Sequence, residues 1–385
     1  MSGFEVKGWC PGALRPMISG DGLVVRVRPH TGRLSAVQAA GLAAAAEAYG
    51  NGLIDLSARA NVQLRGIADG AHGDLLAKLA ALGLLDRDIA TETHRNLIVT
   101  PLWQPGDGTA DLAEALEAAL EAVPDLPAKF GFAVDTGAAP VLSAISADIR
   151  LERAADGRLL LRADGAATGG AVRAAAAPEA ALALARWFVE TGGITGGRGR
   201  MAAHLAAGAP LPEAFQGLMP AAAAMRPEPG MTAIGALVGF EFGQMRAQML
   251  TALASLGAAL RVTPWRMLLI EGASGMPRIE GLITSPADPR LRVTACTGAP
   301  GCPQALGPTR SLARALAAFV PPGAHLHVSG CTKGCAHPHP ASVTLVAAPD
   351  GLALIRQGRA SDTPARRGLA PEMIVGHPET LFEAL

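Results

Sequence analysis

The pattern that most constrains the fold occurs twice in this chain. Residues 22–29 alternate as a strand does, an alanine-rich helix follows, and residues 53–67 predict a second strand region. The same order returns at 233–272, where Thr263 aligns with Ser57 in a segment that matches without a gap. An internal repeat of this kind predicts two copies of one unit related by pseudo-twofold symmetry.

Each copy leads into a second kind of segment. After the first copy come apolar strands around an acidic helix, and after the second come strands around a helix from Ser311 to Phe319. Each half is therefore predicted to mix α and β structure. Residues 205–230 are rich in Pro and Ala and lack sheet periodicity, so we predict a connector between the halves there.

Charge and hydropathy exclude several classes of function. The 33 basic and 33 acidic residues cancel, which argues against general binding to nucleic acid or anionic membranes. The N-terminal residues hold no apolar run long enough for a signal peptide, and no stretch approaches the roughly 20 apolar residues of a membrane span. We expect a cytoplasmic protein with a small-molecule substrate.

Four of the five cysteines lie close together in the sequence, and this clustering is the strongest chemical signal. Five residues separate Cys296 from Cys302, and three separate Cys331 from Cys335. Both loops contain Gly, which lets the backbone approach a bulky inorganic centre and turn its amides toward it. Cys10 lies far away in the sequence, and we expect it to be a free cysteine.

Three interpretations compete for the four clustered cysteines. Structural zinc favours shorter C-x2-C to C-x4-C spacings, and disulfides are rare in cytoplasmic chains. A 4Fe-4S cluster needs thiolates at wider corners, which two Gly-containing loops can supply. We favour the 4Fe-4S cluster. Pro303 begins the segment leading to the next helix, whose amide end would stabilise negatively charged sulfur.

At this point the chain resembles the sirohaem-dependent sulfite and nitrite reductases. The motif C-x5-C followed by "SGCTKGC" resembles their cluster motif. The segments "SARANVQLRG", "HRNLIVTP" and "LPAKFGFAVD" resemble, in the same order, the Arg- and Gln-containing strand, the Arg-Asn segment and the lysine segment of that superfamily. The similarity covers nearly the whole chain.

Within this superfamily the chain is most similar to the precorrin-3B synthase family of aerobic cobalamin biosynthesis. Its opening "KGWCPGALRPM" and the "CAHP" that ends its cluster motif carry that similarity. The resemblance implies an O2-dependent monooxygenase that hydroxylates precorrin-3A at C20 and forms a γ-lactone. It also implies a 4Fe-4S cluster, a second, non-haem iron, and an electron donor such as an NADH-linked reductase or a ferredoxin.

The repeat and the resemblance together predict an α+β fold with a duplicated, sulfite/nitrite reductase-like architecture. Two ferredoxin-like half-domains and two mixed α/β domains are expected in pseudo-twofold relation. The predicted segments are a first half-domain (10–75), a first reductase-like domain (88–204), the connector (205–230), a second half-domain (231–286) and a cluster-binding domain (288–385).

The substrate implied by the resemblance is edged with carboxylates, so its pocket needs fixed cations. Arg59 and Arg95 match the family's tetrapyrrole-pocket arginines by motif, and Asn61 and Gln63 share strand parity with Arg59. The full set of predicted pocket residues is Arg59, Arg95, Lys129, Arg26, Arg28, Asn61, Gln63 and Arg65.

One departure separates the chain from the reductases. They place two lysines two positions apart in the segment that holds the small oxyanion. Here the first of these positions is Lys129 and the second is Gly131. Losing one cationic partner weakens the hypothesis of a sirohaem sulfite or nitrite reductase. An electron carrier and a zinc-containing binding module are further alternatives, and neither requires a ring of arginines.

Candidate ligands for the second iron are His337 and His339, which point to the same side if "HPHP" is extended. The same motif is also compatible with a rigid turn. His94 and His30 are weaker candidates, and His325 together with its neighbour at 327 is expected to belong to a strand.

Overall fold

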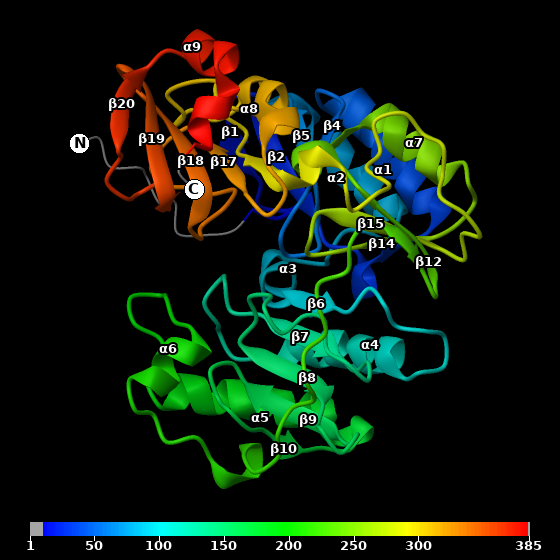
Figure 1. Cartoon of the computed structure of the whole chain (residues 1–385). Helices are drawn as coiled ribbons and strands as arrows, with labels where there is room; N and C mark the ends of the chain where they lie inside the picture. Colours follow the sequence, from blue (N-terminus) through cyan, green and yellow to red (C-terminus); the bar gives the residue numbers. More distant parts are fainter. Residues whose placement is uncertain (1–10, 384–385) are drawn as a thin grey trace.

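The computed structural model describes residues 11–383, so Cys10 lies outside the described residues. Within that range the strands form four sheets of five strands each. Figure 1 shows three of these sheets grouped in one body, with the sheet of β6 to β10 in a separate lobe below them. We call the two sheets built on the repeat the central sheets and the other two the outer sheets.

The first central sheet is antiparallel, and one of its faces is apolar. Val25, Leu64 and Ile54 lie on neighbouring strands in register and are fully buried. The core beneath them is closed by α1 (Ala36–Tyr49) and α2 (His72–Ala81). The strand order is β1 (Met17–Ser19), β2 (Gly22–Val27), β5 (Val62–Ile67), β4 (Leu53–Leu56) and β13 (Gln244–Arg246).

The second central sheet has the same arrangement, and each central sheet takes its last strand from the other half of the chain. The second sheet's order is β11 (Gly230–Thr232), β12 (Gly235–Gly239), β15 (Met267–Glu271), β14 (Leu260–Val262) and β3 (Arg33–Leu34). Gln244 pairs with Asp55 in the first sheet, and Arg33 pairs with Arg261 in the second. This exchange fuses both copies into one hydrophobic core.

Helix α1 shows how the alanine-rich sequence serves this core. Ser35 and Gln38 form a capping box in which each side chain bonds the other's backbone N–H, at 3.1 and 2.9 Å. Ala39 and Ala43 are fully buried, and α1 packs on its equivalent from the second copy, α7 (Ala247–Ala254). Small side chains let the two helices approach closely.

The two outer sheets share one topology. In each, the first three strands run parallel and the last two pairings are antiparallel. The first contains β6 (Leu97–Val99), β7 (Phe132–Asp135), β8 (Ile149–Arg153), β9 (Leu159–Ala163) and β10 (Gly170–Ala171). The second contains β16 (Val293–Ala295), β17 (Leu326–Ser329), β18 (Ala341–Ala348), β19 (Gly351–Gly358) and β20 (Arg366–Leu369).

Helices cover the outer sheets and join the lobes. The remaining helices are α3 (Ile89–His94), α4 (Thr109–Ala119), α5 (Ala177–Glu190), α6 (Met201–Ala206), α8 (Arg310–Leu316) and α9 (Pro371–Gly376).

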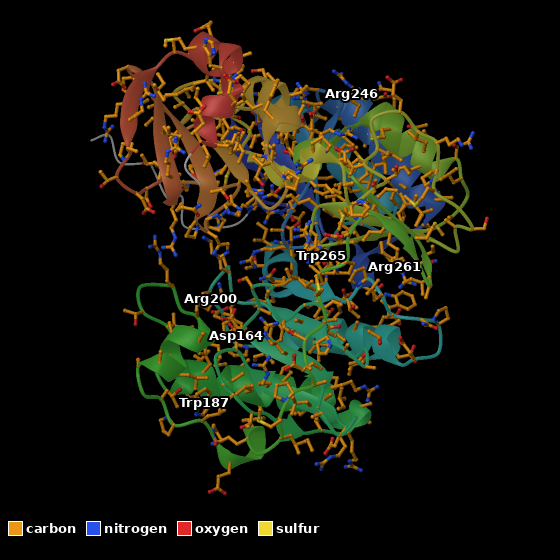
Figure 2. All side chains as sticks on the ribbon, in the orientation of Figure 1. Asp164, Trp187, Arg200, Arg246, Arg261 and Trp265 are labelled. Atoms are coloured by element: carbon orange, nitrogen blue, oxygen red, sulfur yellow. The ribbon has the colours of Figure 1, made fainter. Side chains whose placement is uncertain are left out.

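Arg261 of the second central sheet contacts the lower lobe: it donates to the Pro101 carbonyl at 2.8 Å and stacks 3.7 Å from the Trp103 ring centroid. Figure 2 shows Arg261 and Trp265 at this junction with the lower lobe.

Equivalent turns reveal the duplication in atomic detail. The Ser57 hydroxyl accepts from the backbone N–H groups of residues 59 and 61, at 3.3 and 3.2 Å, and the Thr263 hydroxyl accepts from those of residues 265 and 267 at the same two distances. Ala60 and Arg266 hold the left-handed position in these turns, with φ of 53° and 61°. The predicted internal repeat is therefore present in the backbone.

The predicted elements are largely found. The strand expected over 22–29 is β2, and the helix expected from Ser311 to Phe319 is α8 continued by a 3-10 turn. The strand region expected over 53–67 is instead two antiparallel strands, because the left-handed turn at Ala60 reverses the chain. The α+β class with a duplicated architecture is confirmed. Among residues 11–383, no helix combines the length and apolar character that crossing a bilayer requires.

Candidate functional site: four thiols beside a polar sheet face

The four clustered cysteines lie in two loops at one edge of the second outer sheet. Cys296 directly follows β16, and Cys331 follows β17 after a single glycine. These two strands are adjacent and parallel, so their carboxyl ends deliver both loops to the same place. The sheet topology therefore gathers the thiols that the sequence spacing grouped.

Gly330 holds the two loops together. Its N–H donates to the Cys296 sulfur at 3.1 Å, and its carbonyl accepts from the Leu306 N–H at 2.8 Å. A Cβ at this position would come 2.6 Å from the Ala305 methyl group, so only glycine fits. An amide aimed at sulfur stabilises a thiolate.

The thiols influence one another. Burial raises the pKa of Cys335, Lys333 lowers it, and the thiols of Cys331, Cys296 and Cys302 raise it further. Four mutually repelling thiolates need a positive centre to become compatible with one another. Their sulfur donors and the Gly330 amide match the chemistry of iron–sulfur ligation.

A single metal ion is a different matter. Over residues 11–383, no three His, Cys, Asp or Glu side chains surround a common point at which one ion could be held. The 4Fe-4S assignment of the four cysteines stays a prediction. Thr309, the residue before α8, donates its hydroxyl to the Cys296 carbonyl at 2.7 Å and so ties the start of α8 to the first cysteine loop.

The first cysteine loop is seated on the first central sheet. The Gly301 carbonyl accepts from the Ser19 hydroxyl at 2.5 Å, from the Gly20 N–H at 3.2 Å and from Arg65 Nη2 at 3.3 Å. Arg65 is 5% exposed, and its guanidinium also forms a two-pronged ion pair with Asp21 at 2.7 and 2.9 Å. Arg65 thus fixes the loop to the sheet.

A row of polar side chains crosses the same sheet. Arg26 and Gln63 are paired in register, with two hydrogen bonds at 2.7 and 3.1 Å. Asp55 continues the row on β4, and Gln244 on β13 donates to it at 2.8 Å. This polar row (Arg26, Gln63, Asp55 and Gln244) lies opposite the apolar face that packs on α1, as the alternation of strand side chains requires.

Two further predicted pocket arginines are buried in ion pairs. Arg95 contacts Asp86 through two hydrogen bonds at 2.8 and 3.0 Å; burial alone would lower the pKa of Arg95, but Asp86 outweighs it and raises that pKa. Arg95 also donates to the Arg28 carbonyl at 2.9 Å, and Arg28 donates to the Glu92 carbonyl at 2.7 Å. These arginines join the lower lobe to the first central sheet.

Arg59 and Lys129 are brought together across the two lobes. Arg59 extends from the left-handed turn of the first repeat and donates to the Lys129 carbonyl at 3.3 Å. Lys129 is exposed, whereas Asn61 is buried beside the turn. At Gly131 a Cβ would lie 2.8 Å from the Asn96 amide nitrogen, so a side chain there would displace Asn96 from its 2.7 Å hydrogen bond to the Phe130 carbonyl.

Four histidines gather beyond Cys335. The His337 ring lies 4.8 Å from His325, 5.6 Å from His327 and 6.0 Å from His339, measured between centroids. Burial lowers the pKa of His325 to about 4 and that of His327 to about 3, so both are neutral at pH 7. His327 lies in β17 and His325 directly precedes it, close to the expected strand.

The iron-ligand role of His337 and His339 stays a prediction. His337 contacts the Pro340 carbonyl at 3.3 Å. The weaker candidates lie elsewhere in the molecule: His30 contacts Glu117 at 2.7 Å, and His94 lies 3.9 Å from Asp125.

Several residues of the site escaped the sequence reasoning. Asp55 is contacted by Arg65 at 3.3 Å and by Arg310 at 3.5 Å, and Arg266 donates to the Ala336 carbonyl at 3.2 Å. Position parity with Gln63 could have found Asp55, because the two are in register on adjacent strands. Arg266 and Arg310 carried no local signal.

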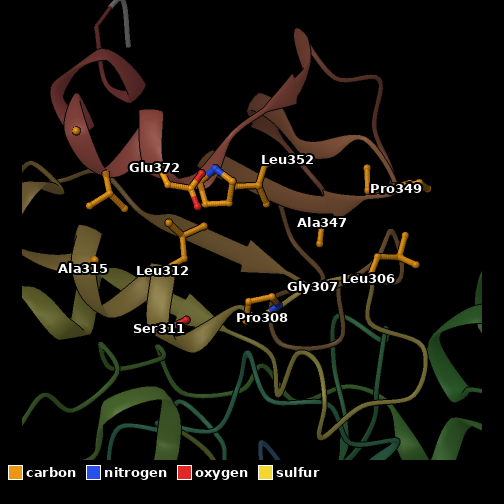
Figure 3. Close-up of a pocket in the computed structure, with 15 residues that line it drawn as sticks. Leu306, Gly307, Pro308, Ser311, Leu312, Ala315, Ala347, Pro349, Leu352 and Glu372 are labelled. Atoms are coloured by element: carbon orange, nitrogen blue, oxygen red, sulfur yellow. The ribbon is translucent and has the colours of Figure 1, made fainter.

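One cavity lies in the domain of the second outer sheet, between α8, α9 and the turn joining β18 to β19 (Figure 3). It measures about 810 Å³ and is lined by apolar side chains such as Leu306, Leu312 and Leu352. Glu372 is the one charged residue in its lining. A carboxylate-rich ligand would be repelled there, so we do not assign the cavity to such a substrate.

Comparisons with known proteins agree with this geometry. Residues 15–82 match the nitrite/sulfite reductase ferredoxin-like half domain. A protein of Sinorhizobium sp named precorrin-3B synthase is 31% identical over 93% of this chain and 84% of its own length. The structure of the NirA protein of Mycobacterium tuberculosis matches with a TM-score of 0.62 at 17% identity, covering 93% of this chain and 79% of that one. That last likeness concerns the fold alone.

Proposed function

The chain belongs to the precorrin-3B synthase family, and we propose that it is an O2-dependent monooxygenase that hydroxylates precorrin-3A at C20 and forms a γ-lactone in cobalamin biosynthesis. One oxygen atom of O2 enters the product, and the other leaves as water with two electrons and two protons. The electrons come from an external donor, an NADH-linked reductase or a ferredoxin. We place the reaction in the cytoplasm.

The observation that carries this proposal is the contact between the first cysteine loop and the first central sheet. The Gly301 carbonyl of the first cysteine loop is bonded by Ser19 and Arg65 of the first central sheet. A redox centre at the thiols would thus lie beside a surface that can bind a carboxylate-rich tetrapyrrole. A 4Fe-4S cluster held by Cys296, Cys302, Cys331 and Cys335 would supply one-electron transfer, which side chains cannot provide.

The chain's own residues bind and orient the substrate in this proposal. Arg26 and Arg59 present guanidinium groups suited to carboxylates, with Lys129 at the mouth of the site. Gln63 holds Arg26 in position through two hydrogen bonds. Asn61 supports the turn that carries Arg59.

The remaining predicted pocket residues position the site. Arg65, Arg28 and Arg95 each donate a hydrogen bond to another part of the protein, so we propose that they hold the loops and lobes in place. His337 and His339 are our proposed ligands for the second iron, with the remaining ligands to be supplied from outside the pair. No step of the proposal depends on that iron.

The first test is a spectrum of anaerobically purified protein, with iron, acid-labile sulfide and extractable tetrapyrrole measured on the same sample. We expect iron and sulfide in near-equal amounts without sirohaem, and conversion of precorrin-3A in the presence of O2 and a reductant. Stoichiometric sirohaem together with sulfite or nitrite reduction would overturn the proposal in favour of a sirohaem reductase.

A variant tests the binding role directly. We expect Arg59→Ala to weaken precorrin-3A binding about tenfold while leaving iron and sulfide content unchanged, because a charge-assisted hydrogen bond contributes roughly 1.5–3 kcal/mol. Arg158→Ala is the control, since Arg158 is an exposed arginine whose side chain pairs with the nearby Asp156 on the surface. Unchanged affinity in Arg59→Ala would place the substrate elsewhere.

A further inference from the structure

The second outer sheet buries a polar ring, that of His327. His327 is fully buried in β17, and neither of its ring nitrogens is bonded by any group within residues 11–383. Burial lowers the pKa of His327 to about 3, so the ring is neutral at pH 7 and one of its nitrogens carries a proton. A buried donor of this kind is normally satisfied, so an acceptor is expected beside the ring.

The neighbouring strands do not supply this acceptor. His327 lies in register with Thr294 on β16 and with Thr344 on β18. The Thr344 hydroxyl donates to the Gly358 carbonyl at 2.8 Å, and the Thr294 hydroxyl contacts His325 Nε2 at 2.9 Å. Both hydroxyls are therefore used elsewhere, and we expect the partner of the ring among the groups that cover this face of the sheet.

The second cysteine loop covers the face of β17 that carries this ring. Leu326 and Val328 belong to the apolar core on one side of the strand. Because strand side chains alternate, His327 and Ser329 lie together on the other side. The Ser329 hydroxyl donates to the Cys331 carbonyl at 2.7 Å. This bond draws the start of the cysteine loop back over the face that holds the histidine.

The same loop passes over the ring at Gly334. A Cβ placed on Gly334 would come 3.7 Å from His327 Cε1 and 3.2 Å from the Ala360 Cβ. Cε1 is the ring atom bonded to both nitrogens, so the nitrogen-bearing edge of the imidazole faces the loop at the residue before Cys335. Gly334 has a φ of 61°, and glycine permits both this left-handed backbone and the close approach to the ring.

The second cysteine loop can offer sulfur to this ring. In the described part of the chain none of the loop's carbonyl groups bonds the ring, which leaves sulfur as the acceptor. The Cys296 sulfur already receives the Gly330 amide at 3.1 Å, whereas within residues 11–383 no hydrogen-bond donor reaches the Cys335 sulfur. Donors to sulfur stabilise its negatively charged form, so the thiol without one gains most from the ring.

We propose that the His327 ring donates a hydrogen bond to sulfur of the cluster held beside Cys335, and that this bond raises the cluster's reduction potential. The inference rests on the proposed function, because it requires the 4Fe-4S cluster of that proposal. A reduced cluster carries more negative charge than an oxidised one, so a hydrogen-bond donor stabilises the reduced form more strongly. In this role His327 makes the cluster easier for the external electron donor to reduce.

The first experiment is pulsed EPR on cluster-loaded, full-length protein, reduced under anaerobic conditions, in which only the histidine rings carry ¹⁵N. We expect a ring nitrogen coupled to the electron spin of the cluster in the wild type. His327→Leu should abolish this coupling, because leucine fills the space without a donor, and His325→Gln should keep it. His325 is the matched control because it lies two residues away, is also neutral, and has its Nε2 engaged by Thr294.

A redox titration followed by EPR gives the second readout. We expect the equilibrium constant for one-electron reduction of the cluster to fall about tenfold in His327→Leu, which is a shift of about 59 mV. His327→Gln should recover part of this loss, because its amide also carries an N–H donor. A merely structural role for the ring would not produce a recovery that depends on the donor.

The outcomes separate this hydrogen bond from the proposed function. Absence of ring-nitrogen coupling in the wild type overturns the bond even if the variants do not fold, and so do equal potentials in His327→Leu and the wild type. Either result leaves the proposed function standing. A wild-type protein that contains no iron and no acid-labile sulfide would overturn both.

Discussion

The loops that follow the first two strands of each outer sheet are equivalent in topology and opposite in character. After β6 and β7 they are closed by protein groups: the Thr109 and Thr136 hydroxyls meet at 2.5 Å, and Asp135 accepts from the backbone N–H groups of Val141 and Leu142 at 2.7 Å. After β16 and β17 they carry four thiols. The same scaffold therefore builds an edge closed by hydrogen bonds in one half and an edge that carries thiols in the other.

The central sheets differ in a similar way. The polar row of Arg26, Gln63, Asp55 and Gln244 corresponds, in the second sheet, to Leu237, Leu269, Arg261 and Arg33. The ion pair between Arg65 and Asp55 is matched by one between Glu271 and Arg261, with the charges exchanged between equivalent strands. Backbone geometry is the same in both copies, while the row of Arg26, Gln63, Asp55 and Gln244 occurs in the first sheet alone among the described residues.

The largest effect is expected where the two outer sheets differ most. Cys335→Ser removes one of four thiols, so we expect loss of the cluster and of precorrin-3A turnover, measured as iron, acid-labile sulfide and product. Thr332→Ala, on the same loop and exposed, is the matched control. A Cys335→Ser protein with full iron content and normal turnover would falsify the assignment.

The second effect concerns the polar row. Asp55→Asn leaves Arg65 and Arg310 without their shared carboxylate, and removing one partner of a buried ion pair costs about 3–5 kcal/mol in free energy of unfolding. Urea unfolding of the wild type and the variant measures this cost. The comparison predicts a smaller loss for Glu271→Gln, because its partner Arg33 is 40% exposed. Equal losses in free energy of unfolding would mean that the ion pairs of Asp55 and Glu271 contribute equally to stability.

Much of the fold could be predicted from the sequence because its signals are local. The alternation of β2, the alanine face of α1 and the match between Ser57 and Thr263 all depend on residues close in the chain. Exchange of β3 and β13 between the sheets could not be predicted, because strands of two and three residues have no periodicity and their register is set by distant partners.

In the candidate site, too, the features set by local sequence could be predicted and those set by distant partners could not. Cysteine spacing and the glycines within the loops predicted one group of thiols, since both loops are short and local. Arg95 was expected in the pocket by motif and Arg65 as an addition to it, yet their guanidinium groups are engaged by Asp86 and Asp21, partners that a motif does not specify. Arg266 could be found only from the backbone geometry of its turn.

The third expected effect is a pH dependence of the free energy of unfolding, which arises from Glu271 in the second central sheet. Burial would raise the pKa of Glu271, but hydrogen bonds from Arg33 and Arg261 outweigh it and lower that pKa. A lowered pKa means that the stabilisation is present above the ordinary carboxyl pKa and is lost as pH falls through the folded value. We expect Glu271→Gln to cost about 1–2 kcal/mol at neutral pH. That cost should shrink as the pH falls below the ordinary carboxyl pKa and through the lowered pKa of folded Glu271, where the wild-type carboxylate becomes protonated too. A difference between the two proteins that does not change with pH would contradict the charge-based explanation.

The smallest effect tests whether the two repeats are still equivalent where their side chains match. Ser57 and Thr263 each accept two backbone hydrogen bonds in the same turn, so Ser57→Ala and Thr263→Val should each lower the free energy of unfolding by about 1 kcal/mol. Valine keeps the shape of threonine and removes only the acceptor. Equal losses measured by urea unfolding would show that the turn is conserved in energy as well as in geometry. A loss in the first repeat alone would mean that Arg266 and its neighbours, rather than the hydroxyl, hold the second turn in its left-handed form.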